Sequence, residues 1–438
     1  MKFIWATYGA LFALGAASHY VLGMHNSLPF FLFLTHCFCV YLYLLLSRDL
    51  SAPVKTLLLV GFALRVAALL YDVYADAPFL MLNVSSDAEY FYEAAMGFSQ
   101  EPSLLFDGES FPRAGMFGKF LGVFMIIEGP HRLWAQYLST VCGISLVIVL
   151  KKAMDVVDIR PRIQVVVVGI AVFFFTSVMK SATLQREMHP AFLTAVSVLM
   201  FLLWLLDGKT RYAVAALVFL LGASFFHAGV IGLAMGYTFG FCFYRHETGK
   251  FSFTVRSVAV MALIVIGSIV LNNYAGDVFF NKFTSVEEVE DIYSRASWFG
   301  KGGAAYNVGV TIDTPLGLFF GGILRTFYFL FSPLPWYWRG MMDALSFLLD
   351  SSLYLFTFGY LILRRKKIFD GSKESRWILI ITIGLLAASF IFGLGTNNAA
   401  PAMRHRQKLV AAFLLVFSMA MNKVSLAKKR LTTPKLSE

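Results

Sequence analysis

Residues 190–206, PAFLTAVSVLMFLLWLL, contain no charged side chain, and Arg186 and Glu187 precede them while Asp207 follows. A helix rises 1.5 Å per residue, so a run of this length comes close to crossing the ~30 Å hydrocarbon core of a bilayer. Similar apolar runs recur along the whole chain. The stretch therefore predicts an all-α polytopic membrane protein.

The composition supports this class. Hydrophobic residues make up 58% of the 438 residues and charged residues only 14%, whereas soluble domains carry about 25% charged residues. The four cysteines lie in apolar runs and form no metal-ligand pattern with the histidines, so we interpret them as packing residues. We expect neither a metal nor another cofactor.

We predict about twelve transmembrane helices, each near the ~20 residues that cross a bilayer. They lie at about 3–23, 28–47, 54–72, 131–150, 164–179, 190–206, 212–228, 229–244, 256–273, 345–363, 377–393 and 407–422. Basic clusters lie between alternate pairs of runs, and Lys and Arg are retained on the cytoplasmic side. Both termini are then cytoplasmic, and the net charge of +11 reflects orientation and not a nucleic-acid partner.

Two further apolar stretches, 113–128 and about 316–335, do not fit this topology as single crossings. If either crossed the membrane alone, the next basic cluster would lie outside. We predict re-entrant or interfacial helices there, because the alternative of fourteen spans would invert the basic loops between them. The chain 1–438 would then be one integral membrane domain with two large outer loops, at about 73–130 and 274–344.

The first outer loop carries Asp87, Glu89 and Tyr90. Carboxylates two residues apart, next to tyrosines, suit a site that hydrogen-bonds sugar hydroxyls, and Asp87 or Glu89 could act as a general base. The alternative is a serine-capped amphipathic helix in which Ser86 is the N-cap and Glu89 occupies the capping-box position.

A second cluster contains Arg186, Glu187 and His189, between two strong apolar runs. Ionisable groups bounded by hydrocarbon are costly unless they pair or face a cavity, so this cluster is a site candidate. The alternative is an outer turn whose long side chains extend to the interface. His227 lies at the next outer turn, as a packing residue or a further site residue.

The second long outer loop carries Arg295 and the glycine-rich stretch 301–307, which suit a phosphate. The segment 333–339 begins with Pro333, Leu334, Pro335 and Trp336, a composition that is more typical of an interfacial anchor or a turn. Arg65 lies inside the predicted span 54–72, and Asp72 and Glu128 are its candidate partners.

The last cluster contains Arg404, His405, Arg406 and Lys408, at the outer mouth of the final predicted span. These cations run against the positive-inside tendency. Guanidinium groups bind phosphate oxygens through two parallel hydrogen bonds. The alternative is an anchor at the lipid headgroups. Taken together, the outer clusters suit a lipid that carries a phosphate or pyrophosphate and a sugar.

Three elements resemble those of Wzy-like repeat-unit polymerases of O-antigen and capsule synthesis, within the GT-C-type polyprenyl-linked glycan transferases. They are the Arg186-Glu187 pair, the Pro333-x-Pro335-Trp336 segment, and Asn397 followed by Arg404-His405-Arg406-x-Lys408. The resemblance covers most of the chain in topology but only short stretches in residues.

The resemblance implies a metal-independent inverting transferase in the bacterial inner membrane. It would move a growing glycan from undecaprenyl pyrophosphate onto a new lipid-linked repeat unit on the outer face, with a chain-length regulator as a partner. Arg186, Arg295, Arg404 and Arg406 would bind pyrophosphate, with Lys408 beside them. Glu187, His189 and His405 would be base candidates. The Asp87-x-Glu89 pair departs from this pattern, because it is more typical of GT-C enzymes with polyprenyl-monophosphate sugar donors.

Two alternatives remain open. A GT-C enzyme of that kind would add one sugar, with Asp87 or Glu89 as base and Tyr90 against the sugar. A lipid-linked oligosaccharide flippase would move its substrate across the membrane without a chemical reaction. The duplicated halves that are common in transporters are not visible in the sequence.

Overall fold

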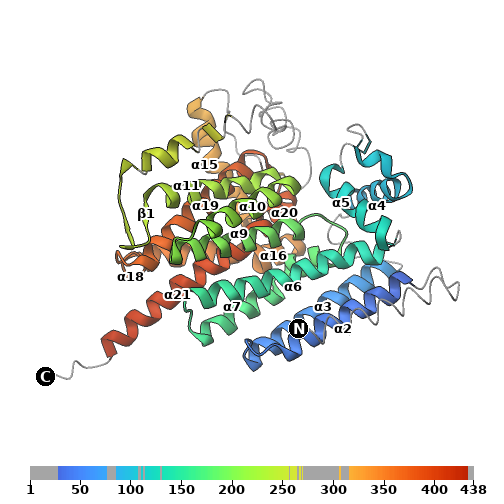
Figure 1. Ribbon diagram of the computed structural model, residues 1–438, viewed down its shortest axis with the longest axis horizontal. Coiled ribbons are helices and arrows are strands. Elements are labelled where there is room, and N and C mark those ends of the chain that lie inside the picture. Colours follow the sequence, from blue (N-terminus) through green and yellow to red (C-terminus); the bar gives the residue numbers. More distant parts are fainter. Residues whose placement is uncertain are drawn as a thin grey trace. The chain divides into compact units, whose positions relative to one another are not determined.

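The computed structural model describes residues 28–75, 85–106, 110, 111, 114–128, 131–255, 257–263, 266, 267, 269, 305, 306 and 315–432 (Figure 1). The described residues are mostly helical (84%), as predicted. A short antiparallel hairpin, β1 (Tyr244–Arg245) with β2 (Lys250–Phe251), is the one sheet among these residues. The predicted first span and Arg295 lie outside the described residues.

Six described helices are long and apolar enough to cross a membrane. They are α3 (Ala52–Tyr74), α6 (Arg132–Val156), α9 (Met188–Asp207), α16–α17 (Met341–Leu363), α19 (Lys373–Leu394) and α20–α21 (Ala399–Ala427). The bent pair α7 (Pro161–Phe173) and α8 (Phe175–Ala182) makes a seventh if it counts as one span. This is consistent with a multi-pass membrane protein.

Shorter apolar helices occupy other predicted spans. They are α2 (Leu28–Leu46), α10 (Thr210–Phe226) and α11 (Leu233–Phe243). The two stretches predicted as re-entrant or interfacial form α5 (Gly115–Glu128) and α15 (Pro315–Phe331). The count of twelve crossings and the re-entrant character of α5 and α15 stay predictions.

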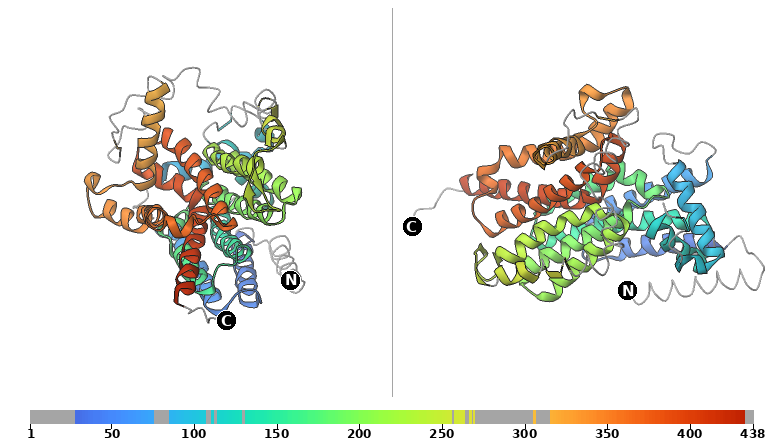
Figure 2. Two further views of the ribbon diagram at one scale, coloured as in Figure 1. Left: turned by 90° about the vertical axis from the view of Figure 1, so that its left-hand side faces the viewer. Right: turned by 90° about the horizontal axis from the view of Figure 1, so that it is seen from above.

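The chain packs as two compact units, and α6, α7 and α9 each pass from one to the other. The first unit is Met1–Val147 with Val168–His189, and the second is Ile148–Val167 with Pro190–Glu438. Within the first, α2 runs beside α3 (Figures 1 and 2), α3 packs on α8, and α4 (Ser85–Gln100) packs on α5. Within the second, α19 packs against α11, α15 and α21 (Val410–Thr432), and α17 (Ser352–Leu363) lies on α21.

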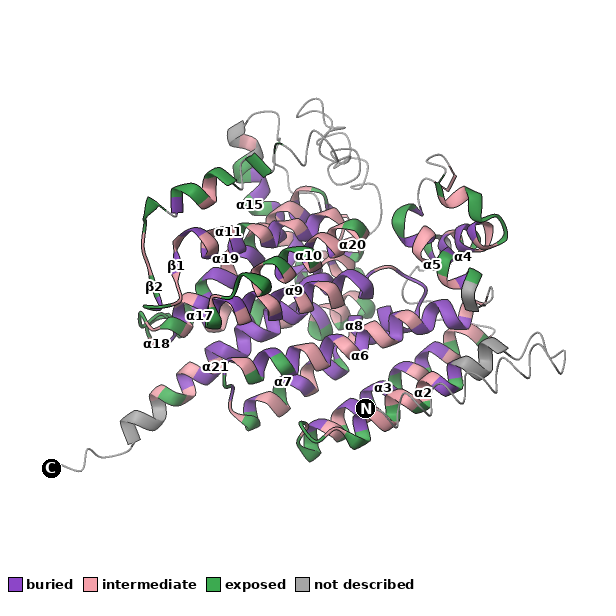
Figure 3. Ribbon diagram, in the orientation of Figure 1, coloured by how far each residue is buried: buried purple, intermediate pink, exposed green. Residues whose placement is uncertain are grey.

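Close helix packing in the second unit depends on small residues. A Cβ on Gly236 of α11 would lie 2.6 Å from the carbonyl oxygen of Ile380 in α19, so only glycine permits this approach. Among the six candidate spans, the buried share is highest in α20–α21, and much of the α21 ribbon is coloured as buried (Figure 3). In α17, by contrast, large apolar side chains such as Phe356 are exposed. Exposed apolar faces of this kind are expected where helices meet lipid.

The predicted span 164–179 is broken at Phe174, which has φ −60° and ψ 112°, and α7 and α8 meet there at a bend of 48°. In a continuous helix the carbonyl of Val172 would accept from a backbone N–H four residues on. Here it accepts from Arg65 Nη1 at 2.9 Å. Arg65 therefore stabilises the end of α7 and the break itself.

Of the two predicted acidic partners of Arg65, only Asp72 has a described side chain, and no ion pair between Asp72 and Arg65 is observed. Asp72 Oδ2 instead accepts from Gln136 Nε2 at 2.7 Å, and the side chain of Glu128 lies outside the described residues. Among the described residues, the hydrogen-bond acceptors of Arg65 are backbone carbonyls and hydroxyls near the break: Gly61 O, Val172 O, Ser177 Oγ and Ser181 Oγ.

The final span begins earlier than the predicted residue 407. Asn398 is the N-cap, and its side chain accepts from the N–H of Ala400 at 3.0 Å, so helix α20 (Ala399–Arg406) starts there. A 3₁₀ turn, Gln407–Leu409, joins α20 to α21. The basic cluster 404–408 consequently lies in the N-terminal part of the candidate span Ala399–Ala427.

Candidate functional site

In the first unit, side chains of α6 hold the segment 181–185, which comprises the C-terminal end of α8 and the residues directly after it. Three α6 residues on one helical face donate to its backbone carbonyls: Thr140 to Ser181 O at 2.8 Å, Gln136 to Ala182 O at 2.8 Å, and Ser139 to Gln185 O at 3.3 Å. Of the residues predicted at this site, Arg186 and Glu187 directly follow the segment. The backbone directly before Arg186 is therefore held by α6.

Aromatic residues of α4 and α5 contact the predicted site residues of this segment. The Arg186 guanidinium carbon lies 5.9 Å from the ring centre of Phe91. His189 packs edge-on against Phe117 and Phe120, with ring centres 5.2 and 5.4 Å apart. Glu187 is fully buried and His189 nearly so. The structure thus brings Arg186, Glu187 and His189 under the helices of the first predicted outer loop.

The three residues predicted on that loop have different surroundings. Glu89 Oε1 forms an ion pair with Arg132 Nη1 of α6 at 2.5 Å. The side chain of Asp87 is exposed, and Tyr90 contacts the ring of Phe111. Glu89 therefore links α4 to α6, while Asp87 remains accessible to solvent.

In the second unit, Arg406 is fully buried and donates four hydrogen bonds to the protein. Nη1 donates to Phe329 O at 2.7 Å and Ser332 O at 2.8 Å. Nη2 donates to Asp350 Oδ1 at 2.5 Å and Ser351 Oγ at 3.1 Å. Neither Arg406 nor Asp350 exposes any side-chain surface.

These bonds give Arg406 an internal role. It satisfies carbonyls at the C-terminal end of α15, where helices leave such groups without partners. Asp350 lies in a π-helical turn, Phe347–Ser351, at the start of α17. A pyrophosphate role for Arg406 stays a prediction, and it would require the guanidinium to leave these acceptors.

The rest of the basic cluster gathers around His405. Lys408 Nζ lies 3.1 Å from His405 Nδ1 and donates to Arg404 O at 3.3 Å. The ring of His227, at the C-terminal end of α10, lies 4.5 Å from that of His405, and Phe392 stacks on His405 at 5.3 Å. When Lys408 is charged it donates to Nδ1, which places the imidazole proton on Nε2.

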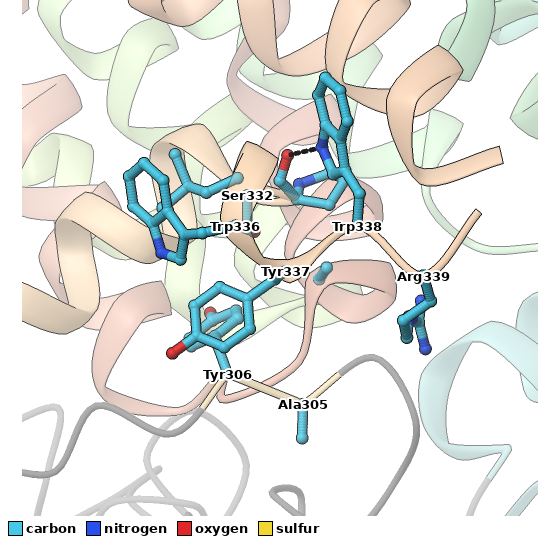
Figure 4. Close-up of a pocket in the computed structure, with 10 residues that line it drawn as sticks. Ala305, Tyr306, Ser332, Trp336, Tyr337, Trp338 and Arg339 are labelled. Atoms are coloured by element: carbon cyan, nitrogen blue, oxygen red, sulfur yellow. Dashed lines mark hydrogen bonds between the residues drawn. The ribbon is translucent and has the colours of Figure 1, made fainter. Parts of the chain in front are cut away.

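A cavity of ≈ 270 Å³ opens beside the end of α15. Its lining comes mainly from the turn after that helix and from the isolated segment at 305 and 306 (Figure 4): Ala305, Tyr306, Ser332, Pro333, Leu334, Trp336, Tyr337, Trp338, Arg339 and Ala399. Trp338 Nε1 donates to Pro333 O at 3.1 Å. The rings of Tyr306 and Tyr337 both contact Tyr328.

Tyr306 is held in this wall by the segment before α20. Its backbone N–H donates to Asn397 O at 3.0 Å, and its hydroxyl donates to Thr396 O at 2.8 Å. Burial raises the pKa of the phenol, so the hydroxyl keeps its proton.

No family model matches the chain, and no curated protein and no solved structure matches it. Among the described residues, no group of three or more His, Cys, Asp and Glu side chains could hold a metal ion.

Sequence reasoning missed two parts of the second-unit site. Asp350, which binds Arg406, was visible as an acid followed by two serines inside an apolar run, a pattern that marks function in membrane helices. The tryptophans of segment 333–339 were interpreted as an anchor, because no sequence signal places Tyr306 against the same cavity. For His227 the sequence predicts either a packing residue or a further site residue, and its ring lies against that of His405.

Proposed function

We propose that this chain is a bacterial inner-membrane glycosyltransferase that polymerises undecaprenyl-pyrophosphate-linked repeat units on the outer face of the membrane. The observation that supports it is the gathering of Arg404, His405, Lys408 and His227 within one helical unit. Cations inside a candidate span are costly unless they face an anion or a wet cavity. A lipid pyrophosphate supplies such an anion at the membrane surface.

In the proposed reaction, a hydroxyl oxygen of the acceptor sugar attacks the anomeric carbon of the donor glycan. The bond from that carbon to the pyrophosphate oxygen breaks, and undecaprenyl pyrophosphate leaves with the electron pair. Arg404 and Lys408 stabilise the negative charge that develops, and one such donor is worth ~3–4 kcal/mol. His405, with its proton on Nε2, acts as a further donor.

The proton of the acceptor hydroxyl passes to a carboxylate. Glu187 and Asp87 are the carboxylates that the sequence predicts for this role. His189 packs between two phenylalanine rings, which suits a base less well.

One observation favours a second candidate, a transporter of lipid-linked oligosaccharide. The broken pair α7 and α8, with fully buried Arg65 at the break, resembles the discontinuous helices of transporters. Transport would move the repeat unit without consuming its pyrophosphate bond.

The length of the surface glycan in a deletion strain tests the proposal. We expect single repeat units there, and restoration of long glycans by the native chain and by the control Arg211→Ala, whose side chain is exposed on another helix. A truncated unit would indicate a single-sugar transferase, and repeat units retained inside would indicate a transporter. Glycans of normal length in the deletion strain would contradict all three.

A further inference from the structure

The cavity at the end of α15 has the chemistry of a carbohydrate site. Trp336 and Trp338 remain 65% and 38% exposed although they line it. Faces of aromatic rings pack against the apolar C–H face of a sugar ring, while hydroxyls at the ring edge meet polar groups. We propose that this cavity binds the sugar that is directly linked to the pyrophosphate of the donor, an inference that rests on the proposed function.

The turn that forms the wall starts at Ser332, which the Arg406 network holds. Ser332 O accepts from Arg406 Nη1 at 2.8 Å and from Ser351 Oγ at 2.5 Å. Both bonds fix the residue from which the turn 333–339 departs. Preorganised walls bind more tightly, since less freedom is lost on binding. Arg406 and Asp350 are thus positioning residues for this cavity.

The internal bonding of Trp338 argues against a membrane anchor. An anchoring tryptophan buries its ring in lipid and points its N–H toward headgroups and water. Trp338 instead donates that N–H to Pro333 O, inside its own turn. The far end of the turn is held too, because Arg339 forms two hydrogen bonds with the carboxylate of Asp343, each 2.9 Å long.

The volume of the cavity and its distance from Arg404 suit one sugar residue better than an oligosaccharide. A volume of ≈ 270 Å³ is just below the ~300–1,000 Å³ of pockets for larger ligands. Ala399 lines the cavity at the first turn of α20, and Arg404 lies five residues along the same helix. This is ~7.5 Å at 1.5 Å per residue, a separation on the scale of one sugar with its phosphate.

Binding of free glycan tests the inference without any transfer reaction. The probe is the oligosaccharide released by mild acid from the lipid-linked unit that accumulates in the deletion strain, labelled metabolically with tritium so that its reducing-end ring stays intact. Equilibrium dialysis against the full chain in nanodiscs free of sugar-headed detergent measures its Kd. We expect Trp336→Ala to raise Kd about tenfold and Trp336→Phe to raise it less than about threefold.

The control is Phe319→Ala, which removes a 55% exposed aromatic ring from α15 away from the cavity. We expect no change in Kd. Because Trp336 is largely exposed, Trp336→Ala should leave the thermal unfolding temperature close to native. If Trp336→Ala lowers that temperature, the comparison of Trp336→Phe with the native chain still tests the cavity.

The outcomes separate the two proposals. If the native chain binds the oligosaccharide through Trp336 but forms no polymer, the cavity is a sugar site and the transferase is wrong. If the native chain polymerises and does not bind the oligosaccharide, or if Trp336→Ala binds like native, the cavity inference is overturned. An equal loss in Phe319→Ala would also overturn it.

Discussion

Arg404 and Arg406 are two residues apart in one short helix, yet their surroundings differ. Arg406 is fully buried and bonded to Asp350, whereas Arg404 is partly exposed beside His405 and Lys408. The sequence alone assigned both to pyrophosphate. Asp350 is 56 residues away from Arg406, and no local pattern predicts that pairing. The two arginines should therefore respond differently to substitution.

Arg406→Ala should destabilise the protein by ~3–5 kcal/mol, because it leaves Asp350 as an uncompensated buried charge. Asp350→Asn should also destabilise. The double variant Arg406→Leu with Asp350→Leu removes both charges and should recover part of the loss. Equilibrium unfolding in mixed micelles measures all three. Native stability of Arg406→Ala together with lost activity would instead assign Arg406 to the substrate.

Arg404→Ala should leave unfolding within ~0.5 kcal/mol of native and lower polymer formation by ~10²-fold or more. Arg404→Lys keeps the charge but loses the planar fork, so we expect only partial rescue. Glycan length in the complemented deletion strain measures both. An Arg404→Ala strain that makes glycans of normal length would reduce this residue to a headgroup anchor.

At the scale of elements, the sequence predicted where helices lie better than how they end. The apolar runs predict α9 and α19 correctly, because a helix that contacts lipid or is buried in the protein core must carry apolar side chains. The break at Phe174 has no proline or glycine within four residues to mark it, and Arg65, which satisfies a carbonyl at the break, lies more than 100 residues earlier in the chain. Likewise, nothing in the local sequence predicts that α6 holds the segment before Arg186.

The contact of α6 with the helix break can be tested at Gly143. A Cβ there would collide with Ser181 Oγ and lie 3.3 Å from Arg65 Nε. Gly143→Ala should therefore destabilise by ~1–3 kcal/mol. The matched control is Gly169→Ala in α7, where the nearest heavy atom would be Leu57 Cδ1 at 3.9 Å. Equal stability of the two variants would show that the packing of α6 at Gly143 does not stabilise the break.

Gln136 should keep the segment before Arg186 closed. In a cysteine-free chain carrying Thr183→Cys, a position that is 1% exposed, maleimide should react slowly. Gln136→Leu removes the donor to Ala182 O, and we expect labelling at least ~10-fold faster because the local opening costs less. Gln164→Leu, which removes a similar glutamine from α7, is the control. Unchanged labelling in Gln136→Leu would show that this bond does not hold the segment.

At the scale of the whole molecule, charge asymmetry predicts orientation. Green fluorescent protein fused after residue 432 should fluoresce, because the basic C-terminal region is expected in the cytoplasm. A fusion within 209–211 should fluoresce too, and alkaline phosphatase at either position should be inactive. The opposite pattern at the C-terminus would overturn the predicted arrangement of twelve spans.

The most direct test of the central claim is reconstitution of the purified chain in liposomes with the lipid-linked unit from the deletion strain, without an ion gradient. We predict a ladder of longer glycans and one undecaprenyl pyrophosphate released for each unit added, both lost in Arg404→Ala and retained in Gly169→Ala. Movement of intact lipid-linked units across the bilayer, with no elongation and no release of undecaprenyl pyrophosphate, would contradict the transferase.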